Sequence, residues 1–154
     1  MQKLVLGFNH SGLVVKNLDS MVKFYAEILG LQVIRKIDSE APVTGDHTGI
    51  SGARRELVFM GKPEGEYLLE LVHYLEPKSE DGHLRRNQLG ASHICFDVSG
   101  LDLLYTRLVQ QGVRFVTPPK AKVGSDGMTT LVCYIQDPEG NWLELIEVID
   151  PGSI

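Results

Sequence analysis

Two histidines and two glutamates of this chain occupy matching places in two similar stretches of sequence. FNHSGLVV is followed by LDSMVKFYAEILGLQVI in the first half, and ASHICFDV is followed by LDLLYTRLVQQGVRFV in the second. Aligning these segments pairs His10 with His93. Farther along, KPEGEYLLELV matches DPEGNWLELIE, which pairs Glu70 with Glu144. Two imidazoles and two carboxylates at equivalent places predict a pseudo-symmetric site for a divalent metal ion.

The two glutamates stand inside strongly apolar segments, LLELV and WLELI. An ionised carboxylate in apolar surroundings is costly unless it is paired or coordinates a metal. One such glutamate alone would fit a salt-bridged core residue, but two at equivalent positions, each matched by a histidine, favour a metal site. Imidazole with carboxylate suits Zn, Ni, Co, Mn or Fe(II). Cys95 and Cys133 lie in apolar strand patterns, so we expect small buried residues there and no thiolate ligand.

The elements that must position these side chains follow from the repeat. The first half predicts one helix and four strands, with strands at 4–15, 31–37, 55–60 and 66–74 and the helix at 20–29. Asp19 is the expected N-cap of that helix, Gly30 its end, and residues 61–65 a turn. The second half predicts the same order, with strands at 91–98, 113–117, 128–136 and 141–149 and a helix at 101–111.

Each half therefore has the order strand, helix, strand, strand, strand. A half of about 75 residues is too small to bury a sufficient core alone. We therefore expect one domain over residues 1–154, made of two βαβββ modules at about 4–74 and 91–149 with a connector at 75–90. The fold class is α+β, with mixed sheets curved around a cleft.

Side chains alternate across a strand, which assigns each candidate to a face. His93, Cys95 and Asp97 share one face, and the wholly apolar opposite face should pack on the helices. Glu144 likewise lies opposite Leu143 and Leu145. In the first half, Glu70 shares its face with Leu68, Val72 and Tyr74, opposite Leu69 and Leu71. The histidine and glutamate faces are therefore predicted to point into the cleft.

Other polar residues fit less specific roles. The polar, glycine-rich stretch 38–54 has little to pack and is expected to be a lid that orders when substrate binds. His47 and Asp46 within it fit a solvated lid better than a substrate contact or second base. His73 alternates away from Glu70 and is predicted to be packed or at the surface, and His83 to be exposed. The arginines are ordinary solvated residues or anion ligands; they are Arg54, Arg55, Arg85 and Arg86.

Composition excludes several classes of function. The formal net charge of −5 argues against a nucleic-acid partner, which requires a basic face. No apolar run approaches the roughly 20 residues of a membrane span. The N-terminal MQKLVLGFNH lacks a signal-peptide pattern and leads directly into the first strand. The sequence therefore predicts a cytoplasmic globular protein with a small-molecule partner.

Three segments, FNHSGLVV with the helix after it, GASHICFDV and DPEGNWLELIE, resemble the vicinal oxygen chelate superfamily. This superfamily includes glyoxalase I, methylmalonyl-CoA epimerase, fosfomycin-resistance enzymes, bleomycin-resistance proteins and extradiol dioxygenases. The resemblance covers nearly the whole chain and implies the glyoxalase-like fold, with one divalent metal ion per site between paired modules. Its ligand positions fall on His10, Glu70, His93 and Glu144.

The ligand set implied by the resemblance is closest to the glyoxalase and epimerase branch, because dioxygenases and fosfomycin-resistance enzymes use only two His and one Glu. This implies a metal-dependent lyase or isomerase that abstracts a proton next to a carbonyl through a metal-stabilised enediolate. Glu144 is the first choice as base and Glu70 the second. Two alternatives stay open: an Fe(II)-dependent extradiol-type dioxygenase, and a non-catalytic small-molecule (drug-resistance) binding protein.

The resemblance also implies substrates and assembly. An α-keto thiol adduct or an acyl-CoA thioester is the expected substrate, and a homodimer the expected assembly. The two modules that share a site belong either to one chain or to two chains of a dimer, since both arrangements occur in the superfamily.

Overall fold

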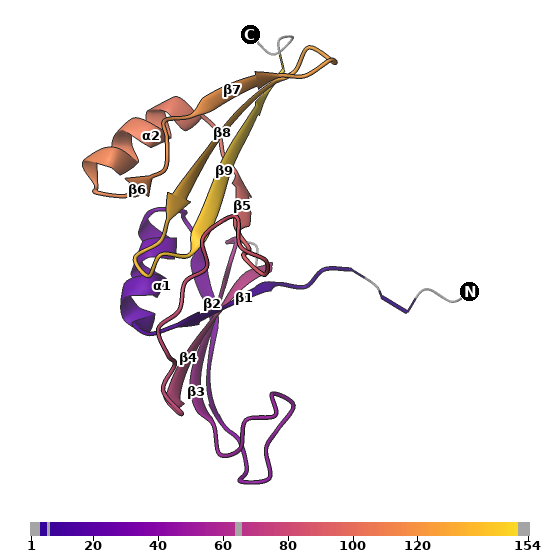
Figure 1. Cartoon of the computed structure of the whole chain (residues 1–154), viewed down its shortest axis with the longest axis vertical. Helices are drawn as coiled ribbons and strands as arrows, with labels where there is room; N and C mark the ends of the chain where they lie inside the picture. Colours follow the sequence, from indigo (N-terminus) through magenta and orange to yellow (C-terminus); the bar gives the residue numbers. More distant parts are fainter. Residues whose placement is uncertain (1–3, 6, 64–65, 151–154) are drawn as a thin grey trace. The chain divides into compact units, whose positions relative to one another are not determined.

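The repeat of the sequence reappears as two units of structure, residues 1–81 and 82–154. The computed structural model describes residues 4–5, 7–63 and 66–150, and Figure 1 shows their helices and strands. Each unit pairs one helix with a sheet that contains both parallel and antiparallel neighbours. The predicted α+β class is therefore confirmed.

The first unit follows the predicted order of elements. They are β1 (Ser11–Val15), α1 (Leu18–Glu27), β2 (Gln32–Glu40), β3 (Arg54–Gly61) and β4 (Tyr67–Glu76). The strands pair in the order β1-β4-β3-β2, with β1 parallel to β4 and the other pairs antiparallel. Met21 and Tyr25 of α1 are fully buried, as are Leu69 and Leu71 of β4. One face of the sheet therefore forms the core with the helix, which leaves the Glu70 face for chemistry.

Helix α1 begins two residues earlier than predicted. Asn17, not Asp19, is the N-cap, because its side-chain oxygen accepts a hydrogen bond from the Ser20 amide at 3.0 Å. Asp19 lies in the first turn, where its negative charge interacts favourably with the positive end of the helix dipole. The end is as predicted: Gly30 has φ of 69° and the Leu31 amide donates to the Tyr25 carbonyl at 3.0 Å.

The first strand is shorter than the predicted 4–15. Strand β1 starts at Ser11, which pairs with Leu69, and β4 itself starts at Tyr67. The apolar residues before His10 therefore have no strand beside them among the described residues, and Leu4, Val5 and Phe8 are exposed. Residue 6 of this strand and residues 64–65 of the predicted turn 61–65 lie outside the described residues.

The second unit repeats the order with one additional strand. Its elements are β5 (Ile94–Asp97), α2 (Leu101–Gln110), β6 (Arg114–Phe115), β7 (Lys120–Val123), β8 (Thr129–Gln136) and β9 (Trp142–Ile149). The main path is β5-β9-β8-β6, and β7 also pairs with β8. Leu143 and Leu145 of β9 are fully buried, which confirms the face predicted for them.

Strand β7 was not predicted, and its separation from β6 has a simple cause. Both strands pair with β8, as β2 pairs with β3 in the first unit. Pro118 and Pro119 stand between them, and proline has no amide hydrogen for a strand ladder. The edge strand is therefore divided into two short pieces.

Helix α2 is capped from the sheet. Its N-cap, Gly100, has no side chain to accept a hydrogen bond. The carboxylate of Glu147 on β9 accepts from the amides of Gly100 and Leu101 at 2.6 and 2.8 Å. A carboxylate at this end of a helix is favourable because it accepts hydrogen bonds from the free amides and interacts with the positive end of the helix dipole.

No helix in the described part of the chain is long and apolar enough to cross a membrane.

Candidate metal centre

In the first unit, His10 and Glu70 come together as predicted. The parallel register of β1 and β4 sets Gly12 beside Glu70, so His10, just before β1, reaches the same carboxylate. His10 Nε2 lies 3.2 Å from Glu70 Oε2, and their side chains are 30% and 21% exposed. On the other side of Glu70 is Phe59 of β3, whose ring meets the His10 ring edge-on at 5.8 Å.

Asn9 orients the His10 ring. Its Oδ1 lies 2.5 Å from His10 Nδ1, and an amide oxygen can only accept, so Nδ1 carries the proton. The Nε2 lone pair of a neutral ring would then face a carboxylate oxygen. In that arrangement both atoms present a lone pair, as two ligands of one cation do. An imidazole oriented through its other nitrogen is also the usual arrangement of a metal-binding histidine.

The second unit repeats this pair. His93 Nε2 lies 3.0 Å from Glu144 Oε2, and their side chains are 45% and 19% exposed. Glu144 is flanked by Cys95 on β5 and by Tyr134 on β8. The Tyr134 ring meets the His93 ring edge-on at 5.4 Å, as Phe59 meets His10.

Cys95 and Tyr134 are the direct neighbours of Glu144 across the sheet, and each carries a group that can donate a hydrogen bond to its carboxylate. Desolvation, then the negative charge of Glu144, raises the pKa of the Cys95 thiol to about 11, and the same causes in the same order raise the pKa of Tyr134. Both groups therefore hold their protons at neutral pH. The prediction that both cysteines are buried is right for Cys133 and wrong for Cys95, which is exposed because its face of β5 is the Glu144 face.

The donor atoms of these pairs fit a first-row divalent ion. Each pair presents one imidazole nitrogen and one carboxylate oxygen, a set that suits Zn, Ni, Co, Mn or Fe(II). Within the described residues of either unit, no group of three His, Cys, Asp or Glu side chains is placed to hold a metal ion. Each unit by itself therefore brings together one such His–Glu pair.

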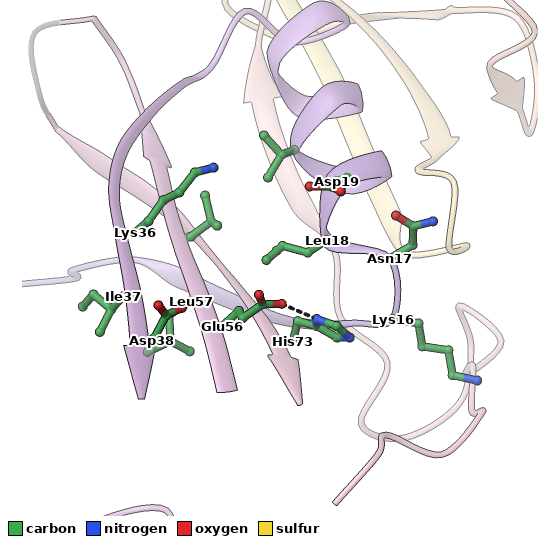
Figure 2. Close-up of a pocket in the computed structure, with 12 residues that line it drawn as sticks. Lys16, Asn17, Leu18, Asp19, Lys36, Ile37, Asp38, Glu56, Leu57 and His73 are labelled. Atoms are coloured by element: carbon green, nitrogen blue, oxygen red, sulfur yellow. Dashed lines mark hydrogen bonds and ion pairs between the residues drawn. The ribbon is translucent and has the colours of Figure 1, made fainter. Parts of the chain in front are cut away.

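A third His–Glu pair, which the sequence reasoning missed, lies on the face of the first sheet opposite to Glu70. His73 does point away from Glu70, as predicted, and its Nδ1 lies 2.8 Å from Glu56 Oε2. Figure 2 shows this pair facing the start of α1, in a cavity of about 350 Å³ whose wall also includes Asp19 and Lys36. Glu56 and His73 are partners across β3 and β4, a register that sequence periodicity alone does not give.

The stretch 38–54 is more tightly bound than predicted. Residues 38–40 belong to β2, and the loop that remains is closed by a hydrogen bond from the Ala41 amide to the Ala53 carbonyl at 2.7 Å. Asp46 in the loop forms an ion pair with Arg55, which is only 4% exposed. The expectation that this loop has little to pack is therefore wrong, because a buried arginine needs a carboxylate partner.

Asp46 is also held by its own loop. Hydrogen bonds from the Thr48 hydroxyl and amide, followed by the Arg55 guanidinium, hold the pKa of this carboxyl well below its usual range. His47 next to it is 87% exposed, which agrees with the solvated role predicted for it.

The four arginines named from the sequence have different surroundings. Arg55 is the buried partner of Asp46, and the Arg54 and Arg85 side chains are exposed. The Arg86 guanidinium lies over two aromatic rings, 4.6 Å from the centre of the Tyr134 ring and 5.3 Å from that of Trp142.

Comparisons with known proteins show what this chain is similar to. Residues 7–145 match the model of the glyoxalase/bleomycin resistance protein/dioxygenase superfamily. A lactoylglutathione lyase of Pseudomonas aeruginosa is 30% identical over 159 residues, covering 96% of this chain and 85% of that protein. The human mitochondrial methylmalonyl-CoA epimerase is 30% identical over 139 residues, covering 89% and 71%. A crystal structure of a glyoxalase family protein from Bacillus cereus superposes with a TM-score of 0.80 at 26% identity, covering 97% and 98%.

Proposed function

Because this chain belongs to the glyoxalase/bleomycin resistance protein/dioxygenase superfamily, we propose that it is a metal-dependent lyase or isomerase. It removes a proton from a carbon atom next to a carbonyl, and its metal ligands are His10, Glu70, His93 and Glu144. The observation that carries this proposal is the His–Glu pair that recurs at the same register position in both sheets. Relatives named lactoylglutathione lyase and methylmalonyl-CoA epimerase support the reaction class.

In this proposal Glu144 takes the substrate proton. Its side chain is largely shielded from water, and the Cys95 thiol and Tyr134 hydroxyl beside it are the donors available to orient its carboxylate. His10, Glu70, His93 and Glu144 would hold a divalent ion, which would supply a Lewis acid for the substrate carbonyl. Asn9 keeps the His10 Nδ1 proton in place, so Nε2 is the nitrogen that faces the site.

Glu70 is the second base of the proposal, required only when the reaction needs proton transfer on both faces of the substrate. Its neighbours across the sheet are Gly12 and Phe59, and neither has a side-chain hydrogen-bond donor. A methyl group added at Gly12 would lie 3.6 Å from Glu70 Oε2, an ordinary contact distance. The glycine therefore leaves this side of the carboxylate open.

The test combines metal analysis with proton exchange. Purified protein would be analysed for bound metal, then incubated in D2O with the methylglyoxal–glutathione adduct or with methylmalonyl-CoA, and deuterium at the carbon next to the carbonyl measured by mass spectrometry. Exchange that depends on Zn, Ni or Co and not on oxygen supports the proposal. Bound iron with oxygen uptake would identify a dioxygenase instead, and ligand binding without metal or exchange would identify a binding protein.

A further inference from the structure

Arg86 lies on the connector before β5, and this connector is fastened to the second sheet. The Trp142 indole donates a hydrogen bond to the Leu84 carbonyl at 3.2 Å. A turn then follows, in which the Gln88 amide donates to the Arg85 carbonyl at 2.9 Å. The backbone on both sides of Arg86 is thereby held, so the guanidinium has a defined place over the Tyr134 and Trp142 rings.

The two rings place Arg86 beside the candidate base. Tyr134 is the direct neighbour of Glu144 across β8 and β9, and Trp142 is two residues before Glu144 on the same face of β9. A guanidinium that covers both rings is therefore one side chain away from the Glu144 carboxylate. The charge of Arg86 also acts on Tyr134, where it opposes the rise in pKa that Glu144 causes.

Among the residues that the structure describes, none forms a hydrogen bond or ion pair with the edge of this guanidinium. Stacking on aromatic rings occupies the flat faces of the group and leaves its five N–H donors at the edge. Among the described residues, the contacts of the Arg86 side chain are the two rings, and no carboxylate lies within ion-pair distance. Arg55 differs in this respect, because its guanidinium already forms an ion pair with the Asp46 carboxylate.

We propose that Arg86 binds an anionic group of the substrate, a carboxylate or a phosphate, while the reacting carbon lies beside Glu144. A planar guanidinium fixed in orientation suits two parallel hydrogen bonds to such a group. The substrate class is then a carbonyl compound that carries an anionic group within a few bonds of the reacting carbon. This assignment rests on the proposed function for the identity of the reacting carbon, but the anion site itself does not.

The binding test uses Trp142, which is the only tryptophan of the chain and touches Arg86. Its fluorescence would be followed while the full-length protein is titrated with malonate, its neutral analogue malonamide, and inorganic phosphate at constant ionic strength. We expect saturable changes with the anions and none with malonamide. Arg86→Met should weaken anion binding about tenfold or more, the usual weight of hydrogen bonds to a charged group.

Arg85→Met is the matched control, because it removes the same charge one residue away and touches neither ring. It should bind both anions as the natural protein does. Arg86→Lys keeps the charge but not the planar fork, so it should restore only part of the affinity. Tighter binding of malonate than phosphate, or the reverse, identifies the anionic group and supports the proposal in either case.

The proposal is overturned if Arg86→Met binds the anions unchanged, if Arg85→Met loses as much, or if malonamide binds like malonate. Equal melting curves of the two Met variants exclude loss of fold as the cause. Failure of the proposed function has a different signature: no deuterium exchange in the natural protein, with anion binding still dependent on Arg86.

Discussion

The two halves of this chain carry the same His–Glu pair and surround it differently. Glu70 stands between Gly12 and Phe59, whereas Glu144 stands between Cys95 and Tyr134. The backbone register thus repeats the geometry of the His–Glu pair, while side chains that carry a hydrogen-bond donor stand beside one carboxylate only. A metal ligand needs a lone pair, but a base must also be aimed at a proton. We therefore propose that the two glutamates divide these tasks.

The largest expected effect tests this division directly. Glu144→Gln keeps the shape and one oxygen ligand but removes the proton acceptor, so kcat should fall by about 10²–10⁴. Glu70→Gln should cost much less, because an amide oxygen can still ligate. Rates would be measured at equal metal content. Similar losses in both variants would indicate a two-base isomerase, and full activity in Glu144→Gln would remove this residue from the mechanism.

Metal affinity should depend on both halves to a similar extent, because the His–Glu pair is the same in each. His93→Ala and His10→Ala each remove one of four ligands and leave two carboxylates that repel. Each should lose metal affinity on the order of 100-fold or more, at least the effect of losing an outer-shell partner. Competition with a chelator would measure it. Unchanged metal content in either variant would contradict the ligand assignment for that half.

Chelation should destabilise the fold, because the metal binds the folded chain and not the unfolded one. With free metal at a thousand times its Kd, the stabilisation is about 4 kcal/mol, which corresponds to a fall in Tm of roughly ten degrees on chelation. Thermal unfolding with and without chelator measures it. Identical curves would mean that the two carboxylates are neutralised in some way other than by a metal.

The Tyr134 hydroxyl offers a finer test of the comparison. Tyr134→Phe makes this neighbour of Glu144 identical to Phe59 beside Glu70, and we expect about a tenfold loss of kcat, in the range of second-shell partners of metal ligands. The reciprocal Phe59→Tyr should leave kcat close to its natural value, because Glu70 is not the main base. Larger losses from Phe59→Tyr than from Tyr134→Phe would reverse the assigned roles.

The smallest effect concerns a loop that only the first half has. Residues 41–53 join β2 to β3, whereas the matching connection between β7 and β8 is the short turn 124–128. The depressed pKa of Asp46 means that its stabilisation is present above its unfolded pKa of about 4 and is lost as pH falls toward the folded value. Asp46→Asn should therefore flatten the acid side of the stability curve and speed proteolysis of the loop. If the stability of the variant falls with decreasing pH as that of the natural protein does, Asp46 does not hold the loop in place.

The sequence predicted the elements and the paired residues because both depend on local patterns. Alternation placed Leu143 and Leu145 in the core, and the repeat aligned His10 with His93 and Glu70 with Glu144, which the structure pairs within each unit. The repeat alone identifies these four side chains, because the alignment does not require knowing which strands are neighbours. Their role as ligands of one metal ion stays a prediction.

The errors arose where the outcome depends on a distant partner. Cys95 looks like a core residue in its strand, but its exposure is set by the face that Glu144 occupies on β9. Arg55 and Asp46 look like ordinary loop charges until the ion pair between them is known. The first strand pairs with β4 only from Ser11 onward, and the apolar character of residues 4–8 does not reveal this limit.

The interrupted edge of the second sheet has a consequence for solubility. An exposed edge strand offers unpaired backbone groups to another chain, which proteins prevent with proline or with charge. Pro118 and Pro119 divide that edge in the second unit, while β2 in the first unit is continuous over Gln32–Glu40 and exposes Arg35, Lys36, Asp38 and Glu40. Salt screens charges but does not alter proline. At high ionic strength, the β2 edge would therefore lose its protection while the divided edge of the second sheet keeps it.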